Sequence, residues 1–126
     1  MRTNEARRDE RREERIRMKI MVDAYGSEEQ AMGWYYYLED QLQFPFTALC
    51  IKKCVTSPLQ LTDEVDVMRM PSEEECEKEM FVMIRWENDC LAVPLSQLKP
   101  TNNTDAPTRE AIEDWHYWLN MGYEFG

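Results

Sequence analysis

Two groups of closely spaced carboxylates are the residues of this sequence best suited to binding a ligand. Residues 73–79 contain five glutamates, and Glu39 and Asp40 form a second, adjacent pair. Calcium prefers hard oxygen ligands, about six to eight of them, supplied by carboxylates, backbone carbonyls and water. The D-x-D-x-D-G loop of an EF-hand is absent from the sequence. The pattern therefore predicts a calcium site of another type.

The pair Glu39 and Asp40 falls in the last turn of a predicted helix. The free carbonyls at a helix C-terminus carry negative partial charge, so each carboxylate there is unfavourable by about 0.3–1 kcal/mol. A bound cation would be stabilised by the carboxylates and the carbonyls together. The alternative is that the pair is part of an ordinary charged surface.

The glutamates of residues 73–79 lead directly into a predicted strand. If Met80 and Val82 face the core, alternation along a strand places Glu77 and Glu79 on the opposite face, with Glu75 beside them if the strand extends that far. Like charges on one face repel, which favours a bound cation as their partner. The alternative is a charged loop that protects an edge strand from aggregation.

The overall charge also favours a cation. The 126 residues carry a formal net charge of −10. Residues 1–19 hold eight basic and five acidic groups, which leaves −13 on residues 20–126. Such a surface repels nucleic acid and anionic membranes, so neither is expected as a partner. Acidity that only maintains solubility is the other interpretation.

Enzymatic activity is not expected. His116 is the only histidine, and HExxH, GxSxG, P-loop and GxGxxG motifs are absent. The four cysteines do not form paired CxxC motifs, so a structural zinc site is a minor alternative to small buried thiols. With no signal-peptide core and no apolar run of about 18 residues, we expect a cytoplasmic protein.

An α+β fold must position these carboxylates. Residues 1–19 are predicted to be a charged helix or a mobile arm. An aromatic helix over residues 27–43 is predicted to begin at Ser27, capped by Gln30, and to end before Pro45. Its apolar stripe consists of Ala31, Trp34, Tyr35, Leu38 and Leu42.

Short strands predicted at 46–52, 65–70, 80–87 and 90–95 indicate a small SH3-like β-barrel over residues 46–100. Pro94 would have to lie at an edge or a bulge. A C-terminal helix over residues 107–121 is predicted to pack with Ile112, Trp115 and Leu119. Residues 20–126 are thus expected to form one domain, a barrel flanked by two helices.

Four segments, in this order, closely resemble the CcbP-type calcium-binding proteins of cyanobacteria. They are Gly33-Trp34-Tyr35-Tyr36-Tyr37-Leu38-Glu39-Asp40, Phe44-Pro45-Phe46, Leu91-Ala92-Val93-Pro94-Leu95-Ser96-Gln97-Leu98 and Glu113-Asp114-Trp115-His116-Tyr117-Trp118. The resemblance extends over about residues 22–125 and does not include the N-terminal arm. It implies calcium binding, an SH3-like barrel flanked by helices, and a role in buffering or sensing cytoplasmic calcium.

The resemblance also implies a set of calcium ligands. Asp40 is the first candidate and Glu77 the second. Further candidates from the same motifs are Glu75, Glu79, Glu39 and Asp114.

A different class of function remains open at this stage. SH3-like barrels often bind peptides through exposed aromatic residues. In an interaction module, an acidic body would favour a basic protein partner, and calcium would be incidental. The tyrosines available for such a surface are Tyr36, Tyr37, Tyr117 and Tyr123.

Overall fold

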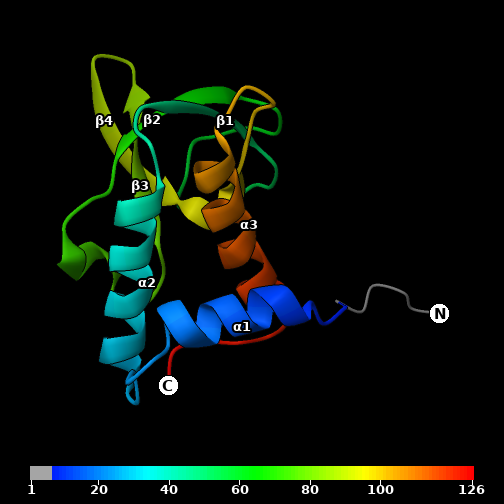
Figure 1. The fold of residues 1–126 in the computed structure, drawn as a ribbon. Coiled ribbons are helices and arrows are strands. Elements are labelled where there is room, and N and C mark those ends of the chain that lie inside the picture. The colour runs from blue at the N-terminus through cyan, green and yellow to red at the C-terminus, as the bar shows by residue number, and fades with distance from the viewer. Residues whose placement is uncertain (1–6) are drawn as a thin grey trace.

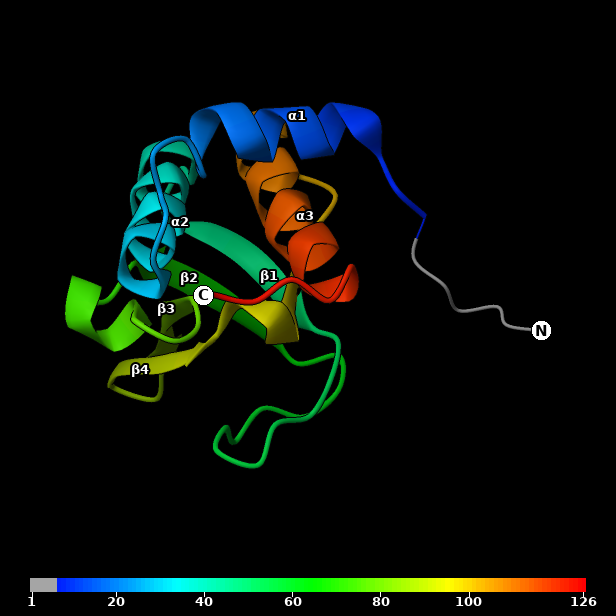
Figure 2. The same cartoon turned by 90° about the horizontal axis from the view of Figure 1, so that it is seen from below.

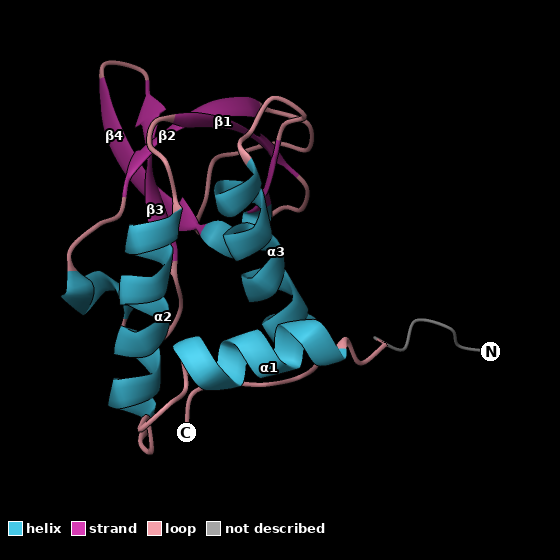
Figure 3. Cartoon of the chain, in the orientation of Figure 1, coloured by secondary structure: helices cyan, strands magenta, loops and turns pink. Residues whose placement is uncertain are grey.

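A computed structural model describes residues 7–126 and shows an α+β arrangement of three α-helices and one antiparallel sheet (Figures 1 and 3). The helices are α1 (Glu10–Lys19), α2 (Ser27–Gln41) and α3 (Ala106–Asn120). The strands are β1 (Phe46–Cys50), β2 (Glu64–Arg69), β3 (Phe81–Trp86), β4 (Asp89–Pro94) and β5 (Leu98–Pro100). Two short 3-10 helices are η1 (Glu73–Cys76) and η2 (Leu95–Gln97). Helices α2 and α3 cover one face of the sheet, and α1 lies across them on the side away from it (Figure 2).

The five strands are ordered β4-β3-β2-β1-β5, and every neighbouring pair is antiparallel. The four predicted strands are present within a residue or two of their expected bounds. The predicted SH3-like barrel is not confirmed, because within residues 7–126 the sheet is open, with β4 and β5 as its edges. Strand β5, which was not predicted, is three residues long and pairs with β1. Pro94 ends the edge strand β4, where the missing N–H is tolerated.

The N-terminal end of α2 is capped differently from the prediction. Gly26, and not Ser27, occupies the N-cap position. The carboxylate of Glu29 accepts hydrogen bonds from the backbone N–H groups of Tyr25 at 2.8 Å and Gly26 at 3.1 Å. Glu29 is the third residue of the helix, where a carboxylate can satisfy otherwise unpaired amides. The side chain of Gln30 does not take this role and instead donates a long hydrogen bond of 3.5 Å to the carbonyl of Ala24.

The apolar stripe predicted for α2 is buried, and Leu42 is buried just beyond the end of the helix. Trp34 of this stripe belongs to an aromatic cluster. The cluster consists of Trp34, Trp115, Trp118, Tyr123 and Phe125. The ring centroids of Trp34 and Trp115 are 5.0 Å apart, and those of Trp118 and Phe125 are 5.2 Å apart. The cluster joins α2, α3 and the C-terminal segment into one core.

Residues 10–19 form a docked helix and not a mobile arm. Asp9 caps α1 by accepting a hydrogen bond from the Arg12 N–H, and Ile16 is buried beneath the helix. The sequence offered few apolar residues to hold this segment, but the structure adds ion pairs to α3, described below. Residues 1–6 of the predicted arm lie outside the described residues. Within the described part of the chain, no helix has the length and apolar character needed to cross a bilayer.

Gly33 allows α2 to approach the segment that follows α1. A Cβ atom at this position would clash with the backbone carbonyl oxygen of Ile20, and only a shift of the backbone could relieve the clash. Gly→Ala in a helix is normally stabilising by about 0.5–1 kcal/mol. For Gly33→Ala we expect the opposite, a loss of about 1–3 kcal/mol in the free energy of unfolding. Urea denaturation measures this, and a stabilised variant would contradict the close approach.

Candidate metal site

Helix α2 and the short helix η1 lie against each other. The Tyr35 hydroxyl donates a hydrogen bond to the backbone carbonyl of Pro71, which fixes the chain just before η1 to the face of α2. Burial raises the pKa of Tyr35, and the charges of Glu39, Cys76 and Glu73 raise it further. A carboxylate of α2 and one of η1 are therefore both within electrostatic reach of one phenol.

The carboxylates along this junction form what we call the acidic surface. It comprises Glu39, Asp40, Glu73, Glu74, Glu75, Glu77 and Glu79. All of these residues are exposed except Glu79, which is half-buried. Within residues 7–126 none of them forms an ion pair, whereas carboxylates of α1 and α3 are paired with arginines. The acidic surface thus holds seven carboxylates that no ion pair neutralises, with Lys78 as the one basic residue within residues 73–79, and such a surface attracts cations.

The structure places residues 73–79 in a turn and not in a strand. Glu73–Cys76 is a 3-10 helix and β3 begins only at Phe81, so the predicted alternation of Glu75, Glu77 and Glu79 on one strand face is wrong. The alternation holds from Met80 onward, where Met80 and Val82 are buried as expected. The turn arises because the buried Cys76 interrupts the acidic run and anchors it.

Glu75 and Glu79 lie on either side of that anchor. Burial raises the pKa of the Cys76 thiol, and the charges of Glu75 and Glu79 raise it further. The Cys76 sulfur also accepts a hydrogen bond from the Phe81 N–H at 3.4 Å. Glu79 accepts a long hydrogen bond of 3.5 Å from the Ser96 hydroxyl. The buried thiol is therefore a structural group with the charges of two carboxylates close to it.

Asp40 and Glu77, the two first candidates, are both exposed. The carboxylate of Asp40 accepts a hydrogen bond from the amide of its neighbour Gln41 at 3.1 Å. In residues 7–126 no three His, Cys, Asp or Glu side chains are already grouped so as to hold a metal ion. The donor chemistry fits calcium, since exposed carboxylate oxygens are hard ligands, and water can complete an incomplete shell.

Asp114, the remaining candidate, lies apart from the acidic surface and is fully buried. Arg12 Nη1 donates to it at 2.6 Å, and Arg15 donates from Nε at 2.9 Å and from Nη2 at 2.8 Å. The Tyr37 hydroxyl donates a further hydrogen bond at 2.8 Å. Both carboxylate oxygens are occupied, and the charge is neutralised by α1. We call Asp114, Arg12, Arg15 and Tyr37 the arginine clasp.

The two arginines of the clasp were not identified from the sequence as partners of Asp114. Hydrogen bonding to Asp114 raises the pKa of Arg15, and burial followed by the same carboxylate raises the pKa of Tyr37. The one available signal was their spacing, since residues three apart lie on the same face of a helix. Arg12 and Arg15 meet that condition, whereas the other two arginines of α1, Arg11 and Arg17, are exposed.

Comparison with known proteins adds to these observations. The CcbP family model, described as calcium binding, matches residues 14–119. The crystal structure of CcbP from Anabaena has 43% sequence identity and a TM-score of 0.84, with 95% of this chain and 98% of that one covered. A calcium binding protein in the calcium-binding form has 42% identity and a TM-score of 0.81, with 99% and 100% covered. No curated protein sequence matches significantly.

Proposed function

Because this chain belongs to the CcbP family of calcium-binding proteins, we propose that it binds Ca²⁺ reversibly at the acidic surface, without an EF-hand. The observation that supports this location is that, within residues 7–126, none of the seven carboxylates forms an ion pair, on a surface shared by α2 and residues 73–79. Their mutual repulsion disfavours the metal-free state, and a divalent ion would relieve it.

Within this surface, Asp40 and Glu77 are the proposed principal ligands. Glu39, Glu75 and Glu79 are the proposed additional ones, and backbone carbonyls at the end of α2 and water complete the shell. The proposed set omits Asp114, because the arginine clasp already occupies its oxygens. Residues 73–79 must then move closer to α2 when calcium binds, since the ligands are not grouped beforehand.

Such a movement suits a protein that buffers or senses calcium in the cytoplasm. Four free cysteines, one of them the exposed Cys90, favour a reducing compartment. A segment that orders around the ion supplies the change in shape that a sensor requires. A buffer would bind with the same ligands but without a partner that reads this change.

The first test is calorimetric titration of metal-stripped protein with CaCl₂ at physiological ionic strength, with and without excess MgCl₂. We expect saturable calcium binding that survives magnesium competition. Asp40→Asn, which keeps the size of the side chain and removes its charge, is expected to weaken binding about tenfold or more. NMR shift changes on calcium addition should concentrate in residues 72–79 and the end of α2.

Glu64→Gln is the matched control, because Glu64 is an exposed carboxylate on β2, outside the acidic surface. Its calcium affinity should equal that of the parent protein. Equal affinities for Asp40→Asn and the parent would remove Asp40 from the site. Weak heat that never saturates and disappears with magnesium would mean that the acidic surface attracts ions without coordinating them.

A further inference from the structure

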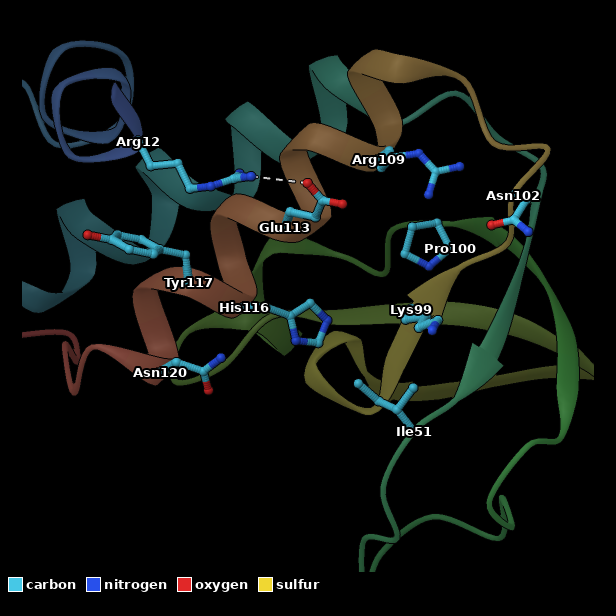
Figure 4. A pocket seen from close by; sticks show the side chains of 10 residues that line it. All are labelled: Arg12, Ile51, Lys99, Pro100, Asn102, Arg109, Glu113, His116, Tyr117 and Asn120. Atoms are coloured by element: carbon cyan, nitrogen blue, oxygen red, sulfur yellow. Dashed lines mark hydrogen bonds and ion pairs between the residues drawn. The ribbon is translucent and has the colours of Figure 1, made fainter. Parts of the chain in front are cut away.

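A pocket lies on the side of α3 that faces β5 and the end of β1, and its lining does not include the acidic surface (Figure 4). Its volume is about 530 Å³. That is within the range of about 300–1,000 Å³ typical of sites for small ligands. Its walls come from α1, the residue after β1, β5, the loop before α3, and α3 itself. Three parts of the chain distant in sequence therefore meet here: α1, the residue after β1, and residues 99–120.

The charge of this pocket is opposite to that of the protein. The chain has 25 acidic and 15 basic residues, yet the lining includes the basic Arg12, Lys99 and Arg109 and only one carboxylate, Glu113. That carboxylate is paired with Arg12 at 3.1 Å (Figure 4). The net positive charge of the lining therefore comes from Lys99 and Arg109. A concave site of positive charge on an acidic protein selects anions against the background field.

Arg109 is held in place with part of its guanidinium unused. Its Nη2 donates to the backbone carbonyls of Thr101 at 2.8 Å and Thr104 at 3.4 Å. Within residues 7–126 its Nε and Nη1 bond to no other group, and neither does the ammonium of the exposed Lys99. An immobilised arginine with free donors binds a phosphate or carboxylate at a smaller entropic cost than a freely rotating one.

The remaining lining supplies neutral donors and an apolar wall. Nε2 of His116 lies 2.7 Å from the carbonyl oxygen of Leu98, so its N–H is used within the protein and the ring offers no further donor to a ligand. Burial lowers the pKa of His116, and the positive charge of nearby Lys52 lowers it further, which keeps the ring neutral at pH 7. The amides of Asn102 and Asn120 and the apolar side chain of Ile51 complete the walls.

We propose that this pocket binds a small organic anion, with its phosphate or carboxylate group on Arg109 and Lys99 and its apolar part against Ile51 and Pro100. The pocket is separate from the acidic surface. Anion binding should therefore not require calcium.

The test is titration of the full chain with phenyl phosphate in calcium-free, resin-treated buffer, followed by ¹H–¹⁵N NMR and calorimetry. Benzoate, inorganic phosphate and phenol are titrated in parallel. We expect phenyl phosphate and benzoate to saturate and to shift the amides of residues 98–102 and of α3. Phenol lacks the charge, so it should bind at least about tenfold more weakly.

Lys99→Gln and Arg109→Gln should each lower the affinity for phenyl phosphate about tenfold. Because Arg109 also holds the loop before α3, the exposed Lys99 is the variant that separates binding from folding. The matched controls are Arg85→Gln and Lys78→Gln, exposed basic residues outside the pocket, which should bind as the parent does.

The relative affinities of phenyl phosphate, benzoate and inorganic phosphate identify the preferred anionic group and the contribution of the apolar wall. Shifts that never saturate, equal binding of phenol, or an unchanged affinity in Lys99→Gln would overturn the proposal. Loss of calcium binding in Asp40→Asn with anion binding intact would show that the two sites are independent.

Discussion

Replacing both Arg12 and Arg15 with methionine is expected to lower the free energy of unfolding by about 3–5 kcal/mol, the usual result of leaving a buried charge without its partner. Asp114 has no exposed surface, so water cannot take the place of the guanidiniums. The arginines also hold α1 against α3, and the helix should detach before the rest unfolds. Urea denaturation followed by circular dichroism measures the loss, and hydrogen exchange locates it.

Two further variants separate this explanation from a general effect of charge. Arg11→Met with Arg17→Met removes the same charge from exposed positions of the same helix and should change stability by no more than about 0.5 kcal/mol per site. Adding Asp114→Leu to the Arg12 and Arg15 double variant should restore part of the loss, because the uncompensated carboxylate is gone. A double variant as stable as its control would contradict the clasp.

Converting Glu73, Glu75, Glu77 and Glu79 to glutamine is expected to weaken calcium binding by about a hundredfold or more. The same change should stabilise the metal-free protein by about 0.5–1 kcal/mol, because it removes repulsion among neighbouring charges. Effects of opposite sign on binding and on stability are the signature of charges maintained for a ligand. Calorimetry and thermal unfolding with and without calcium measure both.

The control for this variant removes four negative charges elsewhere. Glu14, Asp23, Glu64 and Glu87 are exposed and lie outside the acidic surface, and their amide replacements change the net charge by the same amount. We expect calcium affinity to fall only because the long-range electrostatic attraction is weaker. Added salt should reduce this difference in affinity, because it screens that attraction. Equal loss of affinity in both variants would mean that net charge, and not local coordination, attracts the ion.

Helices α2 and α3 and most strands could be predicted because each follows a single period of apolar residues. The stripe from Ala31 to Leu42 specifies α2, and alternation from Met80 to Ile84 specifies β3. Strand β5 was missed because three residues are too few to show a period. The alternation predicted for Glu75, Glu77 and Glu79 is wrong because the strand does not extend back into the acidic run, and the spacing of these residues alone does not distinguish a turn from a strand.

The partners of charged residues could not be predicted in the same way. Asp114 belongs to a motif that the resemblance associates with calcium, and its sequence neighbours give no sign that arginines about 100 positions away neutralise it. The basic pocket is likewise invisible in the sequence, since Lys99 and Arg109 are isolated in an acidic chain and only the fold brings them together. Long-range pairing of charges depends on topology, which periodicity does not encode.

The aromatic cluster gives the protein an optical reporter of its own. Trp34 and Trp115 are buried, and within residues 7–126 their indole N–H groups have no hydrogen-bond partner, so their emission should lie at short wavelength. Trp115 and Trp118 are stacked with centroids 5.5 Å apart, close enough for their excited states to couple. Because Trp34 belongs to the same helix as Asp40, a displacement of α2 would alter the near-ultraviolet dichroism of the unlabelled chain.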